Sequence, residues 1–404
     1  NKIIMKKHLL LAICCSLFLF TGCVNEKGHS FNQEKLAQAD VVIAQAMEEG
    51  HFPGAVLAVV NDDKIEYLKA YGNKSVYPDT VPMSTNTIFD MASVSKCVGT
   101  TLAFMQLVEN GQVRLSDPVS RYIPGFKPWY KIEKVGNGKH EVITDSTTIR
   151  VSHLLTHTSG LPSYVNATWF SEQYGENNPD AFINYIAKDL KRSYKPNTRH
   201  LYSCLNFITL HNIIENVTGM KFSDYVQQNV FDKLGLENTC YNPSEELYDR
   251  IAPTEITDGE VLIGKVHDPL ARVVNGGNSG NAGVFSNAED LAVIASALMN
   301  GGEYKGKRIL SELTVKTMAT VPENVKQFGR ALGWDKESGA ASLKGDLLSD
   351  NTICHTGYTG TSMVIDFDNK IAIILLTNRV HPNDKGSCAR VRAQVANIVA
   401  GAVE

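Results

Sequence analysis

Apolar positions near the N-terminus recur first at helical and then at strand spacing. Apolar residues three or four positions apart predict an amphipathic helix that ends at Gly50. Residues 55–60 form an apolar run typical of a buried strand, and a polar turn at 61–63 leads into a second strand at 64–70.

The C-terminal end mirrors this order. Its pattern predicts strands at 362–367 and 371–377 and a closing helix from 389 to about 403, whereas 201–217 and 288–299 in the middle are helical in pattern. We therefore expect an α+β fold, with one antiparallel sheet built from both chain ends and flanked by helices. A mainly helical region would be inserted at about 112–320, and the junction of the two would form a cleft.

The composition of the 404 residues is that of a globular protein. Hydrophobic residues make up 43% and charged residues 20%, which excludes a wholly disordered or coiled-coil chain. The 39 basic and 43 acidic side chains leave a net charge of -4, so no basic excess points to nucleic acid. Residues 128–146 are charged and contain glycine, and we interpret them as a surface loop or insertion.

The N-terminus has the pattern of an export signal. Lys6 and Lys7 precede an apolar run at 9–20 that is too short to cross a ~30 Å hydrocarbon core as a helix. Small residues before Cys23 resemble a bacterial lipoprotein signal, and an ordinary signal peptide with a chance cysteine is the alternative. We predict a signal at 1–23, a tether at 24–31 and a single hydrolase domain at 32–404.

The lipoprotein hypothesis also sets the expected location. Lipid on Cys23 would tether the protein to a membrane of the bacterial cell envelope, facing the periplasm or the outside. The five cysteines beyond Cys23 are odd in number and widely spaced, which favours free thiols over a disulfide framework or a zinc site. No cluster has metal-ligand spacing, so we expect neither a metal nor a cofactor.

Ser93 and Lys96 stand three positions apart at the start of a helical run predicted for 97–109. At this spacing both side chains lie on one face of the first helical turn. A serine hydroxyl needs a nearby base to act as a nucleophile, and a partly desolvated lysine can lose its proton and serve. A solvated helix start with Ser93 as its N-cap would give the same pattern, so this pair alone is a weak signal.

Two later segments make the signal more specific. The first is Tyr202-Ser203-Cys204, and the second is His355-Thr356-Gly357, which continues through Tyr358 into the C-terminal strand pair. A Ser-x-x-Lys, then a Tyr-x-x, then a basic residue with Thr-Gly at a strand is a rare order.

With these motifs the sequence resembles the serine β-lactamase-related hydrolases of the penicillin-binding-protein type. This family includes class C β-lactamases, DD-peptidases and related esterases and amidases. The resemblance covers about residues 31–404, and it implies a β-lactamase/transpeptidase-like fold. Framework segments that share it lie at 117–119, 153–161, 234–236 and 283–286.

The resemblance also implies roles. Ser93 would be the acylated nucleophile, while Lys96 and Tyr202 would share the work of the general base, with the phenol pKa lowered by neighbouring cations. The N–H groups of Ser93 and Tyr358 would form the oxyanion hole, where one donor is typically worth ~3 kcal/mol. His355 would polarise Tyr202 or bind substrate together with Thr356 and Gly357.

Two departures bear on the substrate. Classical β-lactamases have Lys where this chain has His355, and the Asn of the Tyr-x-Asn motif is replaced by Cys204, a weak hydrogen-bond donor. Both disfavour efficient penicillin hydrolysis. Arg379 could meet a substrate carboxylate or form a surface ion pair, and His267 and Asp268 could border the cleft.

The leading hypothesis is a serine hydrolase that forms an acyl-enzyme on an amide or ester of cell-wall origin, with a peptidase or amidase ranked first. An esterase or acyltransferase passing the acyl group to a small alcohol or amine comes second, and a weak β-lactamase third. The partner would be a small-molecule or peptidoglycan-derived substrate, and the oligomeric state stays open. A non-catalytic envelope binding protein is the alternative of a different class.

Overall fold

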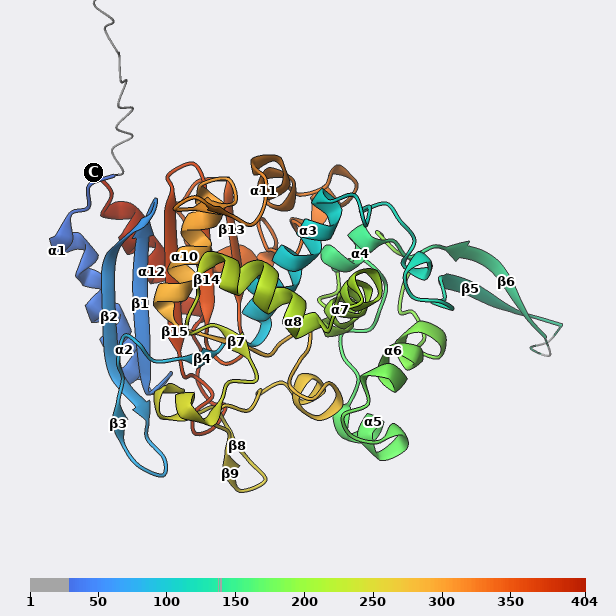
Figure 1. Ribbon diagram of the computed structural model, residues 1–404, viewed down its shortest axis with the longest axis horizontal. Coiled ribbons are helices and arrows are strands. Elements are labelled where there is room, and N and C mark those ends of the chain that lie inside the picture. Colours follow the sequence, from blue (N-terminus) through green and yellow to red (C-terminus); the bar gives the residue numbers. More distant parts are fainter. Residues whose placement is uncertain (1–28, 137, 139) are drawn as a thin grey trace, which may run out of the picture.

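The computed structural model describes residues 29–136, 138 and 140–404, so Cys23 and the predicted signal lie outside the described residues. Its central feature is an antiparallel sheet that joins the two ends of the chain (Figure 1). The strand order is β13-β14-β15-β1-β2-β3. The strands are β1 (Gly54–Asn61), β2 (Lys64–Ser75), β3 (Val81–Pro82), β13 (Thr352–Thr356), β14 (Ser362–Asp366) and β15 (Ile371–Thr377).

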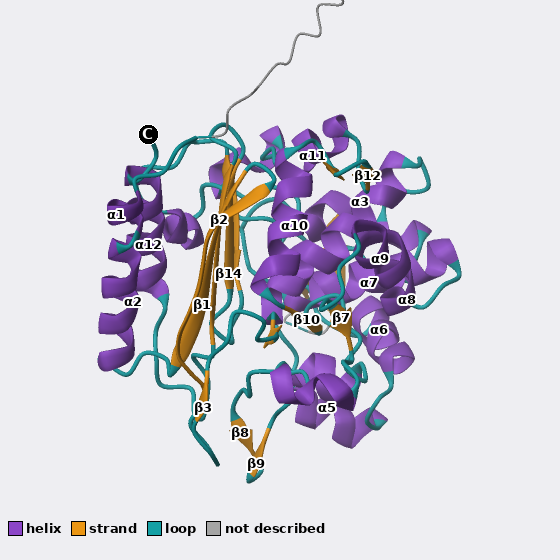
Figure 2. Ribbon diagram, turned by 60° about the vertical axis from the view of Figure 1, so that its left-hand side comes forward, coloured by secondary structure: helices purple, strands orange, loops and turns teal. Residues whose placement is uncertain are grey.

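The register of the sheet explains why its central strands are apolar on both faces. β1 pairs with β15 through Ala58 and Ile374 on one side, and with β2 through Ala58 and Leu68 on the other. Every residue of β1 and of β15 is buried, because helices cover both faces of the sheet (Figure 2). The antiparallel sheet predicted from both chain ends is thereby confirmed.

Terminal helices cover one face of this sheet. They are α1 (Gln33–Leu36), α2 (Gln38–Glu48) and α12 (Ala389–Gly401), and their apolar residues pack with those of β1 and β15 in one core cluster. Of the tether predicted at 24–31, residues 29–31 are described and lie against the body. There Phe31 is buried and bridges Val403.

The opposite face carries α10 (Ala288–Met299) and, beyond it, the helical region (Figure 2). The helices of this region are α3 (Leu102–Glu109), α4 (Val151–Leu155), α5 (Ala167–Tyr174), α6 (Pro179–Lys188), α7 (Cys204–Thr218), α8 (Phe222–Val226), α9 (Asp232–Leu234) and α11 (Glu312–Met318). Residues 205–214 of α7 are all buried, which makes it the core helix of the region.

Short strands complete the helical side of the molecule. A small sheet has the order β4-β10-β7, and its strand β4 ends shortly before Ser93; two further hairpins are short. The bounds of these strands are β4 (Phe89–Asp90), β7 (Cys240–Tyr241), β8 (Ile256–Thr257), β9 (Glu260–Val261), β10 (Val284–Ser286), β11 (Glu303–Tyr304) and β12 (Lys307–Arg308).

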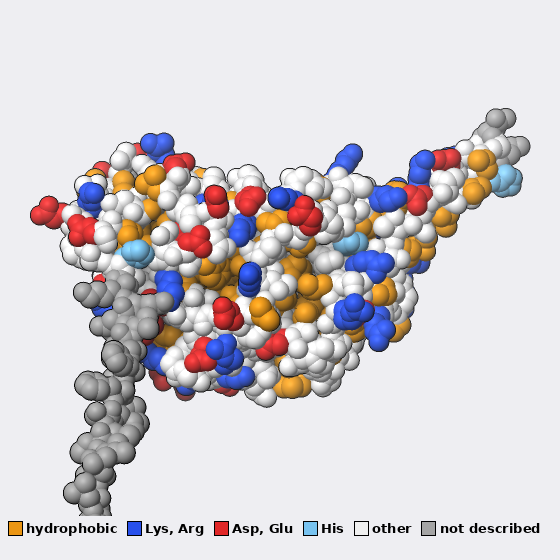
Figure 3. All heavy atoms as spheres, turned by 90° about the horizontal axis from the view of Figure 1, so that it is seen from above, with side chains coloured by type: hydrophobic (Ala, Val, Ile, Leu, Met, Phe, Trp, Pro, Cys, Tyr) orange, Lys and Arg blue, Asp and Glu red, His pale blue; other side chains and the backbone are white. Residues whose placement is uncertain are grey.

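One expectation about local structure needs correcting in part. The segment interpreted as a surface loop or insertion at 128–146 is exposed, but it is no loop: it is a hairpin of β5 (Trp129–Val135) and β6 (His140–Thr147) that projects from the body (Figures 1 and 3). Apolar side chains such as Ile132 and Ile143 are paired across the hairpin and exposed. Because the hairpin buries neither face, its sequence lacks the apolar-polar alternation that marks a half-buried strand.

Two further observations concern the described part of the chain. No helix there combines the length and apolarity that a membrane crossing requires. The five cysteines at 97, 204, 240, 354 and 388 are free thiols, as expected.

Candidate active site

Ser93 stands on a strained turn between β4 and the helical turns that follow. Ala92, directly before it, has φ 45°, a left-handed conformation that costs a non-glycine residue on the order of 1 kcal/mol. The buried Asp90 carboxylate holds this turn, because it accepts the N–H of Ala92 at 2.8 Å and that of His267 at 2.7 Å. The strain was not predictable from the sequence, and it aims Ser93 into the cleft between sheet and helical region.

Lys96 contacts Ser93 as the spacing predicts. Its side chain is 0% exposed, and its Nζ donates to Ser93 Oγ at 3.0 Å and to the carbonyl of Asn281 at 2.7 Å. Residues 96–101 are π-helical and α3 begins only at Leu102, so the predicted helix starts with a wider turn. Burial alone would lower the pKa of Lys96, but the nearby Cys204 and Tyr202 side chains raise it above its ordinary value.

Tyr202 lies in an extended segment just before α7, and its ring contacts the lysine. Lys96 Nζ is 5.1 Å from the centroid of the ring, and the His157 ring packs against it at 4.4 Å. The phenol hydroxyl is buried and lacks a hydrogen-bond partner within the described residues. The expected lowering of the phenol pKa was wrong, because burial raises it by more than the Lys96 ammonium lowers it.

His355 and Thr356 end β13 and Gly357 directly follows it, and all three line a cavity together with Ser93. His355 Nδ1 must donate to the Thr356 carbonyl at 2.8 Å, which leaves Nε2 as a buried acceptor without a partner among the described residues. Burial, and after it the charge of Arg330, holds the pKa of His355 well below its usual range, so the ring is neutral. A Cβ on Gly357 would lie 2.5 Å from the Met91 carbonyl, so only glycine lets β13 approach the Ser93 turn this closely.

Cys204 occupies the first position of α7, with its thiol 3.7 Å from Lys96 Nζ. Burial raises the pKa of this thiol, so it is protonated and remains a weak donor. Asp268 is linked to Lys96 through Asn281. The side-chain amide of Asn281 donates to the Asp268 carboxylate, and the backbone carbonyl of Asn281 accepts from Lys96 Nζ.

Two cavities flank Ser93, and Ser93, Tyr202 and Tyr358 line both. The first, of about 450 Å³, lies along β13 and the start of α12, and its charged and histidine side chains are mainly basic. The second, of about 570 Å³, lies on the α7 side, where Cys204, Glu255, His267 and Asp268 line it. We call them the basic cavity and the acidic cavity.

The basic cavity contains donors without acceptors. Arg330 is 2% exposed, and one of its nitrogens, Nη1, pairs with buried Asp335 at 2.8 Å. Its other two nitrogens, Nε and Nη2, are buried and have no partner within the described residues, and the same holds for Nε2 of His200 and Nε of Arg392. A buried donor without an acceptor is costly, and the described residues supply no acceptor for these nitrogens.

No motif in the sequence singled out Arg330, His200 or Arg392. An arginine directly before the apolar run 331–334, with Asp335 five positions on, was the available signal. For Arg379 the sequence left open a contact with a substrate carboxylate or an ion pair, and in the structure it forms an ion pair with Asp384. Within the described residues no group of three or more His, Cys, Asp or Glu side chains could hold a metal ion.

This geometry coincides with a match to a known protein family. The model of the family described as Beta-lactamase matches residues 39–397, nearly the whole described chain. The chain belongs to the β-lactamase family. It is therefore an enzyme of that hydrolase family, and the resemblance stated from the motifs is confirmed.

Curated relatives match most of the chain. A protein of Escherichia coli K12 named "Putative D-alanyl-D-alanine carboxypeptidase" is 33% identical over 92% of this chain and 89% of its own length. A Bacillus subtilis protein named "N-acetylmuramyl-L-alanine amidase" is also 33% identical, over 89% of this chain and 84% of its own.

Solved structures share the fold. The hydrolase EstCE1, described as having promiscuous acyltransferase activity, has a TM-score of 0.71 at 23% identity, covering 91% of this chain and 99% of its own. FmtA from Staphylococcus aureus has a TM-score of 0.66 at 18% identity, over 93% of this chain and 89% of its own. At these identities the likeness supports the fold and no particular substrate.

Proposed function

We propose that this β-lactamase-family hydrolase acylates Ser93 with the acyl part of a cell-wall peptide and releases a leaving group that carries a free carboxylate. Ser93 Oγ attacks the carbonyl carbon, and its proton passes to the Lys96–Tyr202 pair and then to the leaving amine. Water then attacks the acyl-enzyme and frees the acyl group and the serine.

The protonation states define what the pair must do first. The raised pKa values of Lys96 and Tyr202 make the resting pair an ammonium and a neutral phenol. That pair carries one proton too many to accept another, so it must lose one before Ser93 can be deprotonated. Because its pKa is lowered, His355 can accept a hydrogen bond through Nε2 but cannot hold this proton, so the proton leaves to solvent.

The oxyanion would be bound by backbone donors. The N–H groups of Ser93 and Tyr358 belong to residues that line both cavities, which supports this assignment. Two fixed amides in a largely buried site stabilise developing negative charge more than solvent water would.

The observation that carries the substrate class is the open edge of Arg330. Nε and Nη2 of a guanidinium present two parallel N–H groups, which match the two oxygens of a carboxylate. Arg330 lines the basic cavity together with Ser93 and Thr356. A D-alanyl-D-alanine terminus has its carboxylate one residue beyond the scissile bond, so carboxypeptidase activity fits this cavity.

The relatives' names support a cell-wall substrate. The unpaired donors of Arg330 favour the carboxypeptidase over the amidase. An amidase that cuts between sugar and peptide has no carboxylate at the first position of its leaving group and would leave Arg330 unsatisfied. Acyl transfer is a second candidate, because the acidic cavity also reaches Ser93 and could admit an amine or alcohol in place of water. Cys204 in place of asparagine disfavours β-lactam turnover.

Product analysis tests the proposal. The full chain is incubated with muropeptides ending in D-Ala-D-Ala, and the released amino acid and shortened peptide are separated by chromatography. We expect free D-Ala from the wild type and none from Ser93→Ala, whose unfolding temperature should stay unchanged. Release of intact peptide from sugar would favour the amidase, and binding without any product would favour the envelope receptor.

We also propose a cell-envelope location with a lipid on Cys23, which is supported by the N-terminal sequence pattern and by the relatives' cell-wall names. Expression of the full chain with labelled fatty acid should give a labelled membrane protein. The Cys23→Ala variant should lose the label, and an unlabelled wild type would contradict the anchor.

A further inference from the structure

Tyr358 is held by contacts from outside its own turn. It lies between Gly357 and Gly360, in the turn that joins β13 to β14, and its side chain is 59% exposed. Glycines leave a turn conformationally free, and φ of Gly360 is 116°. An exposed residue in such a turn would be mobile unless other elements fixed it.

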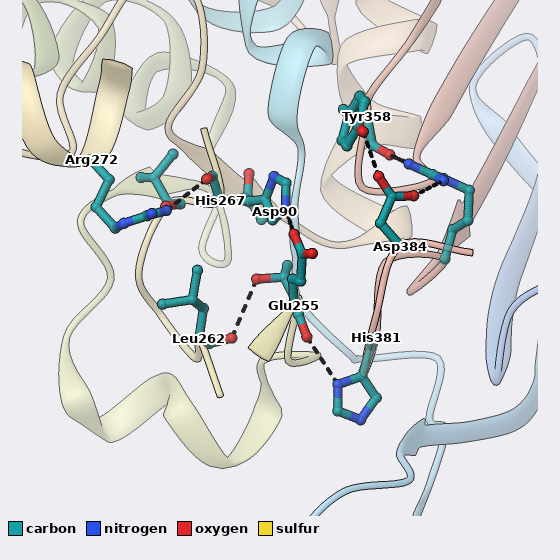
Figure 4. A network of polar contacts seen from close by, with 11 residues as sticks. Asp90, Glu255, Leu262, His267, Arg272, Tyr358, His381 and Asp384 are labelled. Carbon is teal, nitrogen blue, oxygen red and sulfur yellow. Dashed lines mark hydrogen bonds and ion pairs between the residues drawn. The ribbon is translucent and has the colours of Figure 1, made fainter. Parts of the chain in front are cut away.

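A single short segment fixes both ends of Tyr358 (Figure 4). Arg379, just beyond β15, donates from Nε to the Tyr358 carbonyl at 3.1 Å and also from Nη2. Its Nη1 pairs with one oxygen of Asp384, while the other oxygen of Asp384 accepts the phenol of Tyr358. We call these two side chains the Arg379–Asp384 clamp.

The clamp is rigid in its own surroundings. Arg379 Nη1 also donates to the carbonyl of Gly386 at 3.0 Å, and its guanidinium lies 4.9 Å from the centroid of the Tyr358 ring. On the other side the His267 ring stacks on Tyr358 with centroids 5.6 Å apart, and Glu255 holds that imidazole at 2.9 Å. The hydrogen bond between the Tyr358 phenol and the Asp384 carboxylate lowers the pKa of Asp384 and raises that of Tyr358. An ionised acceptor therefore faces a neutral donor.

We propose that Arg379 and Asp384 are positioning residues that fix Tyr358, so that its N–H points to the oxyanion and its ring separates the two cavities. The inference rests on the proposed function, because it assigns the Tyr358 N–H to the oxyanion hole. A donor adds to catalysis only if it is already aimed where charge develops. Thr359 and Thr361 tie the same turn to the carbonyls of Asp90 and Met91, so loss of the clamp would misdirect Tyr358 without releasing the turn.

The test compares Arg379→Gln, Asp384→Asn and Tyr358→Phe in the full chain. Arg379→Gln should lower kcat about tenfold to a hundredfold, up to the loss of one oxyanion donor, with KM within about twofold of the wild type. Affinity for a peptide boronic acid, which forms a tetrahedral adduct, should fall in parallel. Asp384→Asn and Tyr358→Phe disturb the same contact, so their double variant should be little worse than either one.

Controls separate positioning from structure. Arg379→Lys, which retains one donor, should recover part of kcat, and Arg308→Gln, which breaks the exposed pair with Glu303, should behave as the wild type. Wild-type values of kcat and boronate affinity in Arg379→Gln, or a rise in KM alone, would overturn the clamp. The rate at which a fluorophosphonate labels Ser93 distinguishes the two levels: an unlabelled wild type defeats the proposed function, whereas equal labelling of wild type and variants defeats only the clamp.

Discussion

Replacing Arg330 with lysine should remove most of the preference for a free carboxylate on the leaving group. Lysine keeps a positive charge beside buried Asp335 but loses the pair of unpartnered N–H groups at Nε and Nη2 of a residue that lines the basic cavity. A hydrogen bond to a charged group contributes about 1.5–3 kcal/mol, and each 1.4 kcal/mol is about tenfold. The loss of one such bond should therefore lower kcat/KM for the acid substrate about 10-fold to 100-fold.

The assay uses two matched peptides, one ending in D-Ala-D-Ala with a free carboxylate and one with the same end as an amide. Arg330→Lys should lose activity on the acid and keep the small activity on the amide, so the ratio of the two kcat/KM values falls. Arg308→Lys, in an exposed pair with Glu303, is the matched control and should leave the ratio unchanged.

Stability must be followed in the same experiment. Breaking a buried ion pair by removing one partner costs about 3–5 kcal/mol, so Arg330→Met alone would confuse folding with binding. The double variant Arg330→Met with Asp335→Asn removes both charges and should show the same loss of preference. The reasoning is refuted if Arg330→Lys cleaves the acid like the wild type, or if it loses acid and amide activity in equal proportion.

Three further predictions concern other groups. Because the pKa values of Lys96 and Tyr202 are raised, their pair gains a free acceptor as pH rises, so fluorophosphonate labelling should quicken between pH 7 and 9, and a flat profile would contradict this. Cys204→Asn restores an amide donor beside Lys96 and should raise the rate of penicillin acylation; no gain would mean that another feature excludes β-lactams. Burial, and after it Arg150, lowers the pKa of His153 from 6.5 to about 4, so the folded state resists a proton that the unfolded state takes up. The free energy of unfolding is therefore unaffected by protonation of His153 above pH 6.5 and falls by about 3 kcal/mol as the pH drops towards 4. Urea unfolding should show a shallower pH dependence in His153→Gln than in the wild type.

Local patterns in the sequence were sufficient for the sheet and for the contact between Ser93 and Lys96. The run at 55–60 predicted β1 because both faces of that strand are buried, and the spacing of Ser93 and Lys96 predicted their contact because neighbouring turns bring them together. The approach of Tyr202 and His355 depends on long-range folding, so it came from the family resemblance alone.

Other features depend on surroundings that a sequence does not display. The strain at Ala92 comes from Asp90 and the β13–β14 turn, which hold a conformation that alanine does not favour by itself. The expected direction of the Tyr202 pKa shift was wrong because burial of the phenol raises its pKa by more than the charge of Lys96 lowers it, and burial depends on neighbours that only the fold brings together. Arg330 was missed because only the fold shows that it has one paired nitrogen, two unpaired nitrogens and a place in the same cavity as Ser93.

The covalent state of Ser93 during turnover tests the central claim most directly. The full-length enzyme is mixed with an ester analogue of the peptide, whose better leaving group lets the acyl-enzyme accumulate, and is quenched in acid and weighed intact. The account predicts a mass increase equal to the acyl group, located on the fragment that contains Ser93 and absent from Ser93→Ala. Product formation with no adduct on Ser93, or an equal adduct on Ser93→Ala, would contradict it.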